Sequence, residues 1–105
     1  VGALVPVDAL ATPDARRGAI EAWAAALLPG MTVALSTHIN ADGDGCGSEA
    51  ALSRLLAQRD IACRIVNPTP WPQMFRFLLG GPVQDRSDEG VAALAHADGL
   101  MVVDI

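Results

Sequence analysis

Apolar residues recur along the chain in two alternating patterns, one with helical spacing and one typical of strands. The helical spacing predicts helices over residues 12–28, 45–59 and 87–96, and a short helical turn over 73–79. The short apolar runs "MTVALS", "IACRIVN" and "GLMVVDI" predict strands over 31–36, 61–67 and 99–105. Because strands and helices alternate, we expect an α/β fold, with a doubly wound, mainly parallel sheet and helices on both faces.

The predicted helices carry start and stop signals and apolar faces. Thr12 is the expected N-cap of the first helix, Pro13 its first residue, and Pro29-Gly30 its stop. Ser87-Asp88-Glu89 is expected to cap the third helix, which ends near His96. The first helix is predicted to bury Ile20, Trp23, Ala24, Leu27 and Leu28, and the second to bury Ala51, Leu52, Leu55 and Leu56. Residues 1–30 therefore read as an N-terminal helical segment that precedes the α/β part, 31–105.

Composition and charge narrow the functional classes. The net charge of −5 argues against a general nucleic-acid-coating surface. No apolar run approaches the ~18 residues of a membrane span, and no signal peptide opens the chain, so we expect a cytoplasmic protein with no membrane partner. Cys46 and Cys63 form neither a disulfide framework nor a zinc motif, and we expect both to be reduced.

Polar residues that can carry chemistry follow each predicted strand. The first strand leads into "THINADGDGCGS", residues 37–48, which holds His38, Asp42 and Asp44. Asn67 ends the second strand and Asp104 ends the third. In open α/β sheets ligands bind beyond the carboxyl ends of the strands. We therefore expect the histidine and the three carboxylates to meet at one edge of the sheet.

This loop resembles several known ligand-binding loops. Residues 43–48 nearly match the dinucleotide fingerprint, but two aspartates stand where a pyrophosphate would approach, and Asn67-Pro68 lacks the usual acidic partner of the ribose. A calcium loop fails because its fifth and twelfth positions are Cys46 and Ser53. A P-loop fails because no lysine follows the glycines. An ordinary polar turn, with Asp44 capping the second helix, stays open.

A metal site explains the pattern better. A histidine combined with carboxylates suits manganese or a related divalent ion. Asp104 follows Val102 and Val103, and a buried carboxylate there needs a cation or hydrogen-bond donors. Two ions about 3.5–4 Å apart could share such a cluster and hold a phosphoryl group in line with an activated water.

The same residues resemble a known family. "THINADGDGCGSEAAL" is similar to motif I of the DHH phosphoesterases, H-x-x-P-D-x-D-x-x-G-S, with Ala41 at the position of the proline. "ADGLMVVDI" is similar to their motif II, an apolar strand that ends in a metal-bridging aspartate. The resemblance covers roughly residues 31–105 and is greatest to the bacterial nano-RNases.

The resemblance implies a catalytic and metal-binding set. His38 and Asp42 would bind one Mn²⁺, Asp44 a second, and Asp104 would bridge them, with Mg²⁺ or Co²⁺ as other ions. Ser48 and Asn67 are candidate substrate contacts. The implied substrates are short oligoribonucleotides or 3′-phosphoadenosine 5′-phosphate, hydrolysed by metal-activated water. A homodimer stays open. The alternative function is a metal-independent nucleotide-binding module that uses Gly43–Ser48.

The resemblance also sets an expectation about completeness. The Asp-His-His motif, a later metal-binding aspartate and the C-terminal substrate domain of the family would all lie beyond Ile105. We therefore expect these 105 residues to be the N-terminal part of a DHH domain, inactive in hydrolysis by themselves.

One aromatic segment offers a further possible substrate contact. In "PTPWPQMFRFLL", Trp71 and Phe75 are candidates for stacking on a base, and Arg76 for contacting a phosphate. Packing of these aromatic residues around a short helix is the expectation that we prefer.

Overall fold

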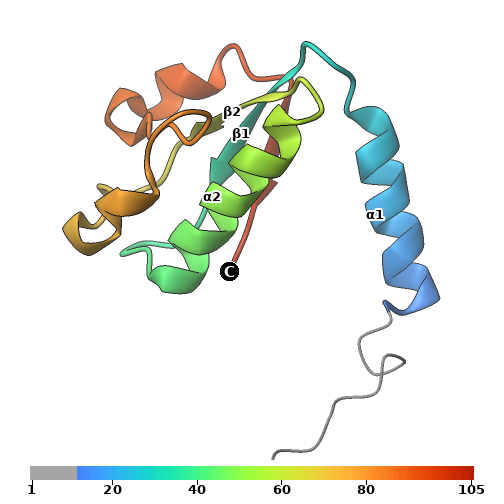
Figure 1. The fold of residues 1–105 in the computed structure, drawn as a ribbon, viewed down its shortest axis with the longest axis horizontal. Coiled ribbons are helices and arrows are strands. Elements are labelled where there is room, and N and C mark those ends of the chain that lie inside the picture. Colours follow the sequence, from blue (N-terminus) through green and yellow to red (C-terminus); the bar gives the residue numbers. More distant parts are fainter. Residues whose placement is uncertain (1–11) are drawn as a thin grey trace, which may run out of the picture.

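The computed structural model describes residues 12–105, and Figure 1 shows the arrangement of their helices and strands. The three strands form one parallel sheet, which confirms the predicted α/β class. In chain order the elements are α1 (Asp14–Ala26), β1 (Thr32–Ser36), α2 (Gly43–Ala57), β2 (Ala62–Ile65), the 3₁₀ helices η2 (Gln73–Leu78) and η3 (Ser87–Leu94), and β3 (Gly99–Val102). Residues 1–11 of the predicted N-terminal segment lie outside the described residues.

The strand order, β2-β1-β3, places β1 at the centre of the sheet. Its inner residues Val33, Ala34 and Leu35 are at most 1% exposed, as the apolar run "MTVALS" predicts. The chain passes from β1 to β2 on one side and then returns to place β3 on the other side. This reversal creates a topological switch point between the carboxyl ends of β1 and β3, which is where open α/β sheets bind ligands.

Helical segments cover both faces of the sheet, in agreement with a partial doubly wound fold (Figure 1). Val33 and Leu35 belong to the main core, to which α2 contributes Cys46, Ala50 and Leu56. Ala34, which alternates to the other face, packs in a smaller core with Val66 and with Ala93 of η3. The period-two alternation of β1 therefore assigns one face to α2 and the other to η3.

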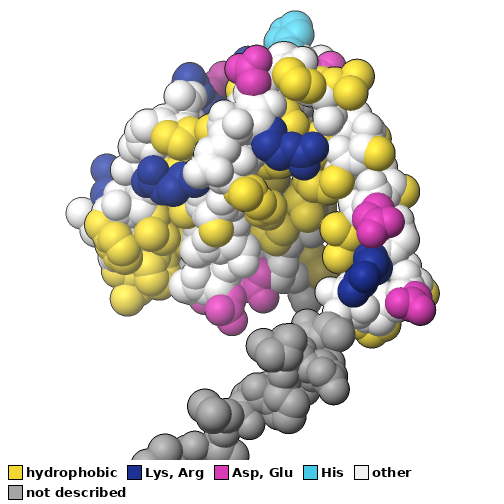
Figure 2. All heavy atoms as spheres, turned by 45° about the vertical axis from the view of Figure 1, so that its right-hand side comes forward, with side chains coloured by type: hydrophobic (Ala, Val, Ile, Leu, Met, Phe, Trp, Pro, Cys, Tyr) yellow, Lys and Arg dark blue, Asp and Glu magenta, His cyan; other side chains and the backbone are white. Residues whose placement is uncertain are grey.

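The predicted buried face of α1 is wrong, because no residue of this helix is buried. Trp23 and Leu27 are partly buried against the main core, but Ile20 is 52% exposed and Leu28 56% exposed. The helix also begins at Asp14, with Pro13 rather than Thr12 at the N-cap position. Figure 2 shows hydrophobic side chains gathered on the surface between α1 and the rest of the molecule. The helix thus lies beside the body instead of on the sheet, which leaves Ile20 and Leu28 of the predicted apolar stripe exposed to solvent.

The predicted core face of α2 is also displaced. Leu56 is buried as expected, but Ala51 and Leu55 are exposed. The buried positions are instead Gly45, Cys46, Glu49, Ala50, Ser53 and Leu56. Two of them, Glu49 and Ser53, are polar, so the helical spacing of apolar residues does not predict their burial.

The segment from 87 to 96 is not the continuous α-helix that its sequence predicts. It is a 3₁₀ segment interrupted at Gly90, where φ is 58° and ψ is −139°, a conformation that favours glycine. Its N-cap position is Arg86, without a side-chain cap, and the segment ends at Leu94, so His96 lies in the following turn. The predicted helical turn at 73–79 is confirmed as η2.

Candidate metal centre at the carboxyl edge of the sheet

The site begins where β1 ends. Thr37 is 4% exposed, and its backbone N–H donates to Oδ1 of Asn67 at 3.1 Å, while its Oγ1 donates to the Asp104 carbonyl at 3.4 Å. These bonds attach the end of β1 to the segments that follow β2 and β3. His38 therefore leaves the sheet from an anchored position.

Asp42 is held by the start of α2. It is the N-cap residue, and its Oδ1 accepts a hydrogen bond from the Gly45 N–H at 3.0 Å. The Cys46 N–H donates to the Asp42 carbonyl at 2.9 Å and continues the helix. One carboxylate oxygen of Asp42 thus belongs to the helix cap, whereas Oδ2 faces His38.

Asp104 follows β3 and adopts a left-handed backbone conformation, with φ of 53°. Asp and Asn tolerate this region better than most residues because their short side chains can hydrogen-bond locally. The Val103 N–H donates to the Ser36 carbonyl at 2.9 Å, so the end of β3 stays in register with β1 up to this residue. The turn at Asp104 then places its carboxylate next to His38.

Three candidate ligands converge at the switch point. His38 Nε2 lies 3.2 Å from Asp104 Oδ2 and 3.7 Å from Asp42 Oδ2. One ligand atom from each residue lies within 4.8 Å of the other two. A nitrogen with two carboxylate oxygens, all partly open to solvent, is a donor set that a divalent ion could bind.

The tautomer of His38 supports this fit. Its Nδ1 lies 2.8 Å from the Ile39 carbonyl oxygen, which can only accept, so Nδ1 carries a proton. The lone pair of the neutral ring is then on Nε2, which faces the two carboxylates. Metal-binding histidines usually donate their other N–H in this way, and the bond fixes the ring orientation.

The electrostatics follow from the same contacts. The hydrogen bond to the Ile39 carbonyl, together with the neighbouring Asp104 and Asp42, raises the pKa of His38. The hydrogen bond from the Gly45 amide lowers the pKa of Asp42. With Nε2 protonated, the imidazolium neutralises part of the carboxylate charge, and a divalent ion would compete with that proton for the same nitrogen.

The other predicted site residues lie around this group. Asp44 is exposed in the first turn of α2 and does not belong to the three-residue group. Ser48 is half-buried, one turn further along the helix. Asn67 is 5% exposed, and both ends of its side-chain amide are engaged in buried hydrogen bonds. The structure thus brings together three of the four predicted ligands.

The aromatic segment packs around the short helix η2, as the sequence predicts. Trp71 is 7% exposed, and its Nε1–H donates to the Phe75 carbonyl at 2.9 Å. Phe75 packs against the main core, and its ring lies next to Gly43 at the start of α2. The aromatic residue that is open to solvent is Phe77, which is 77% exposed.

Sequence reasoning missed a buried carboxyl beside the site. Glu49 of α2 is fully buried, its Oε1 accepts from Nδ2 of Asn67 at 3.0 Å, and its Oε2 has no hydrogen-bond partner among the described residues. Burial away from water raises the pKa of Glu49 to about 7. Burial, with Glu49 nearby, raises the pKa of the Cys46 thiol to about 11, so the thiol is protonated at neutral pH. The signal in the sequence is a glutamate at the position of a core residue, one turn after Cys46.

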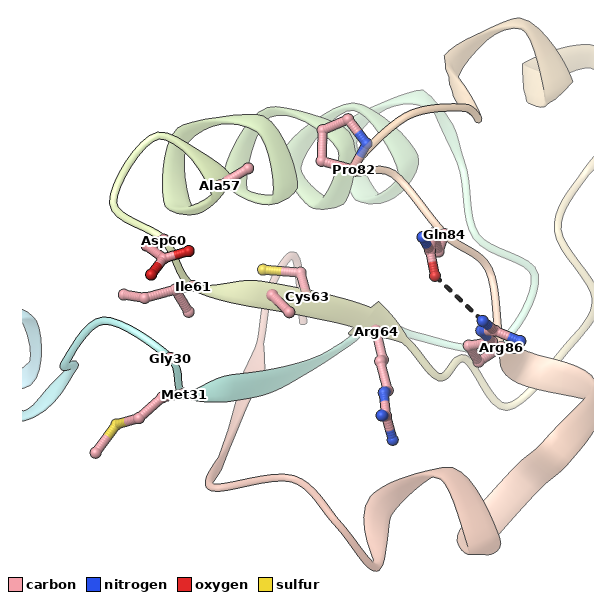
Figure 3. A pocket seen from close by; sticks show the side chains of 11 residues that line it. Gly30, Met31, Ala57, Asp60, Ile61, Cys63, Arg64, Pro82, Gln84 and Arg86 are labelled. Atoms are coloured by element: carbon pink, nitrogen blue, oxygen red, sulfur yellow. Dashed lines mark hydrogen bonds between the residues drawn. The ribbon is translucent and has the colours of Figure 1, made fainter.

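A cavity lies away from this group. It has a volume of about 520 Å³ and is bordered by Gly30 and Met31 before β1, by Asp60 after α2, and by Arg64 and Arg86 (Figure 3). Gly30, Met31 and Asp60 lie at the amino ends of β1 and β2, opposite the edge that carries His38. Because ligands of open parallel sheets bind at the carboxyl edge, we assign the candidate site to the His38 group.

Comparisons with known proteins found no match for the chain. No family model, no curated protein and no solved structure matches it. Within residues 12–105, the helices are too short or too polar to cross a membrane. The interpretation of the site therefore depends on the geometry of its own residues.

Proposed function

We propose that this chain carries part of a metal-dependent phosphoesterase site that acts on short oligoribonucleotides or on 3′-phosphoadenosine 5′-phosphate. The observation that carries the proposal is the convergence of His38, Asp42 and Asp104 at the switch point of the sheet. The resemblance of the surrounding motifs to DHH phosphoesterases supports it and suggests the substrate class.

The residues present would do three things in such a reaction. His38 Nε2 and the Oδ2 atoms of Asp42 and Asp104 would hold Mn²⁺, and Asp44 would contribute to a second ion if the two-ion scheme applies. A bound divalent ion lowers the pKa of its water and neutralises charge on the phosphoryl oxygens. The first amides of α2 would add a positive dipole end for the substrate phosphate.

The alternative, a metal-independent nucleotide site at Gly43–Ser48, has less support. The amide of Gly45 donates to Asp42, so one of the N–H groups that would cradle a phosphate is already engaged. The carboxylate of Asp42 also stands at the helix N-terminus, where a phosphate would have to approach. We therefore place the phosphate next to an ion and not directly on the glycine turn.

Calorimetric titration with Mn²⁺ provides the first test, because it needs only the ligands described above. Asp104→Asn should weaken Mn²⁺ binding at least about tenfold, since a charged ligand is lost. Asp60→Asn is a matched control: Asp60 shares the left-handed conformation of Asp104, with φ of 61°, but borders the cavity at the opposite edge. Equal affinities for the two variants and the wild type would contradict the metal site.

Hydrolysis provides the second test. The full-length protein is assayed with a short oligoribonucleotide and with 3′-phosphoadenosine 5′-phosphate, with Mn²⁺ or with EDTA. We expect turnover that EDTA and Asp42→Asn abolish. Nucleotide binding that persists unchanged in EDTA would favour the metal-independent module.

A further inference from the structure

A buried set of hydrogen bonds connects the three chain segments that carry the candidate ligands. Its centre is Asn67, just after β2, whose Oδ1 accepts from the Thr37 N–H and whose Nδ2 donates to Oε1 of Glu49. The Asn67 N–H donates to Oγ of Ser87 at 2.8 Å, and Thr37 Oγ1 reaches the Asp104 carbonyl. Glu49, Asn67 and Thr37 are all at most 5% exposed.

Burying polar groups destabilises a fold unless hydrogen bonds replace the lost contacts with water, and here one buried oxygen lacks such a bond. A buried polar atom without a hydrogen-bond partner destabilises a fold, and Oε2 of Glu49 has no such partner among the described residues. Leucine or methionine would fill this position of α2 without that penalty. A carboxyl here is therefore better explained by what Oε1 does, which is to hold the side chain of Asn67.

We propose that the Glu49–Asn67 pair is a positioning device for the group formed by His38, Asp42 and Asp104. Asn67 fixes the backbone of Thr37, which precedes His38, and Thr37 in turn holds the backbone of Asp104. Glu49 ties Asn67 to α2, the helix whose N-cap is Asp42. The pair thereby links the ends of β1, β2 and β3 to one helix, and it sets the separation of ligands that come from distant parts of the sequence.

This inference rests on the proposed function, since positioning matters only if the group binds an ion. Asn67→Ala would leave the Thr37 N–H and Glu49 Oε1 without their partner, and Glu49→Ala would release the Asn67 side chain. We expect each variant to weaken Mn²⁺ binding by roughly 10–100-fold, the usual effect of losing a partner that orients metal ligands. Glu49→Gln keeps an acceptor for Asn67 Nδ2 and should bind Mn²⁺ nearly as well as the wild type.

The matched control is Ser53→Ala. Ser53 is fully buried in the same helix, and its Oγ donates to the Glu49 carbonyl at 2.8 Å, so the variant also loses a buried hydrogen bond. It should retain wild-type Mn²⁺ affinity when titrated under conditions where circular dichroism shows all variants to be folded. Wild-type affinity in folded Asn67→Ala and Glu49→Ala, or weakening as large in Ser53→Ala, would overturn the inference.

A measurement without metal separates this inference from the proposed function. In ¹H–¹⁵N spectra of the metal-free protein, Asn67→Ala should shift the amide signals of residues 37–39 and 103–105, whereas Ser53→Ala should not. Absence of these shifts overturns the positioning role whatever the metal does. Absence of Mn²⁺ binding to the wild type, with the shifts present, overturns the proposed function and leaves the link between the segments established.

Discussion

The contact between Gly45 of α2 and Thr37, just after β1, gives a sharp test of how the loop that carries His38 is built. At Gly45 an added Cβ would lie 2.8 Å from Oγ1 and 3.1 Å from Cγ2 of Thr37. At Gly47, in the same helix, an added Cβ meets no atom within 4 Å. Thr37 cannot easily give way, because it is buried and β-branched and its Oγ1 donates to the Asp104 carbonyl.

The two alanine variants isolate the cost of this contact. In either position alanine gains roughly 0.5–1 kcal/mol over glycine in a helix interior. Gly47→Ala should therefore stabilise the protein by about that amount. Gly45→Ala should gain the same term and lose about 1–3 kcal/mol to overpacking, so its net effect ranges from nearly neutral to destabilising by about 2 kcal/mol.

Urea unfolding followed by far-ultraviolet circular dichroism measures both variants against the wild type. The difference between the unfolding free energies of the two variants should be about 1–3 kcal/mol in favour of Gly47→Ala. Equal stabilities would show that α2 does not approach the end of β1 as closely as described. That result would also weaken the link from Thr37 to Asp104.

Two predictions concern pH. Because burial raises the pKa of Glu49 from its ordinary value of 4.5 to about 7, the folded state holds this proton more tightly than the unfolded state. The unfolding free energy should thus fall as the pH rises from about 4.5 to about 7, by roughly 2–3 kcal/mol, and Glu49→Gln should lose this dependence in urea unfolding. An unchanged pH profile in that variant would refute the burial of a titrating carboxyl. Because its environment raises the pKa of His38 above 6.5, Mn²⁺ affinity should increase with pH, by up to about tenfold per unit below that raised pKa, as the ion displaces the proton. A calorimetric affinity that stays constant from about pH 5.5 to 8 would contradict ion binding at Nε2.

Much of the fold follows from short-range patterns in the sequence. The apolar run around Val33 marks a strand covered on both faces, and β1 is buried in this way. The run around Ile65 is interrupted by Arg64 and forms the less buried strand β2, and both strands form where predicted. Parallel topology then implies that His38 and Asp104 meet, although they are far apart in sequence. This juxtaposition depends only on the direction and order of the strands. Both can be predicted from the alternation of strands and helices along the chain.

The features of the fold that the sequence patterns do not predict depend on tertiary contacts and local backbone angles. The core face of α2 includes Glu49 and Ser53, and an amphipathic pattern assigns such residues to solvent. Their hydrogen bonds to Asn67 and along the helix replace the apolar contacts that the pattern assumes. Gly90 interrupts the 87–96 segment because its backbone angles are not helical, and the spacing of apolar residues does not predict these angles. In each case a specific partner or backbone angle overrides a periodic preference.

The separation of 66 residues between His38 and Asp104 has a consequence for folding. Bringing such distant groups together costs loop-closure entropy, which the pairing of β1 with β3 must offset. His38 and Asp42 are therefore in place as soon as β1 and α2 form, but the three-residue group is complete only after β3 has docked. If the group binds Mn²⁺ as proposed, the appearance of Mn²⁺ binding during refolding would report the docking of β3, and Mn²⁺ added early would not accelerate the steps that precede it.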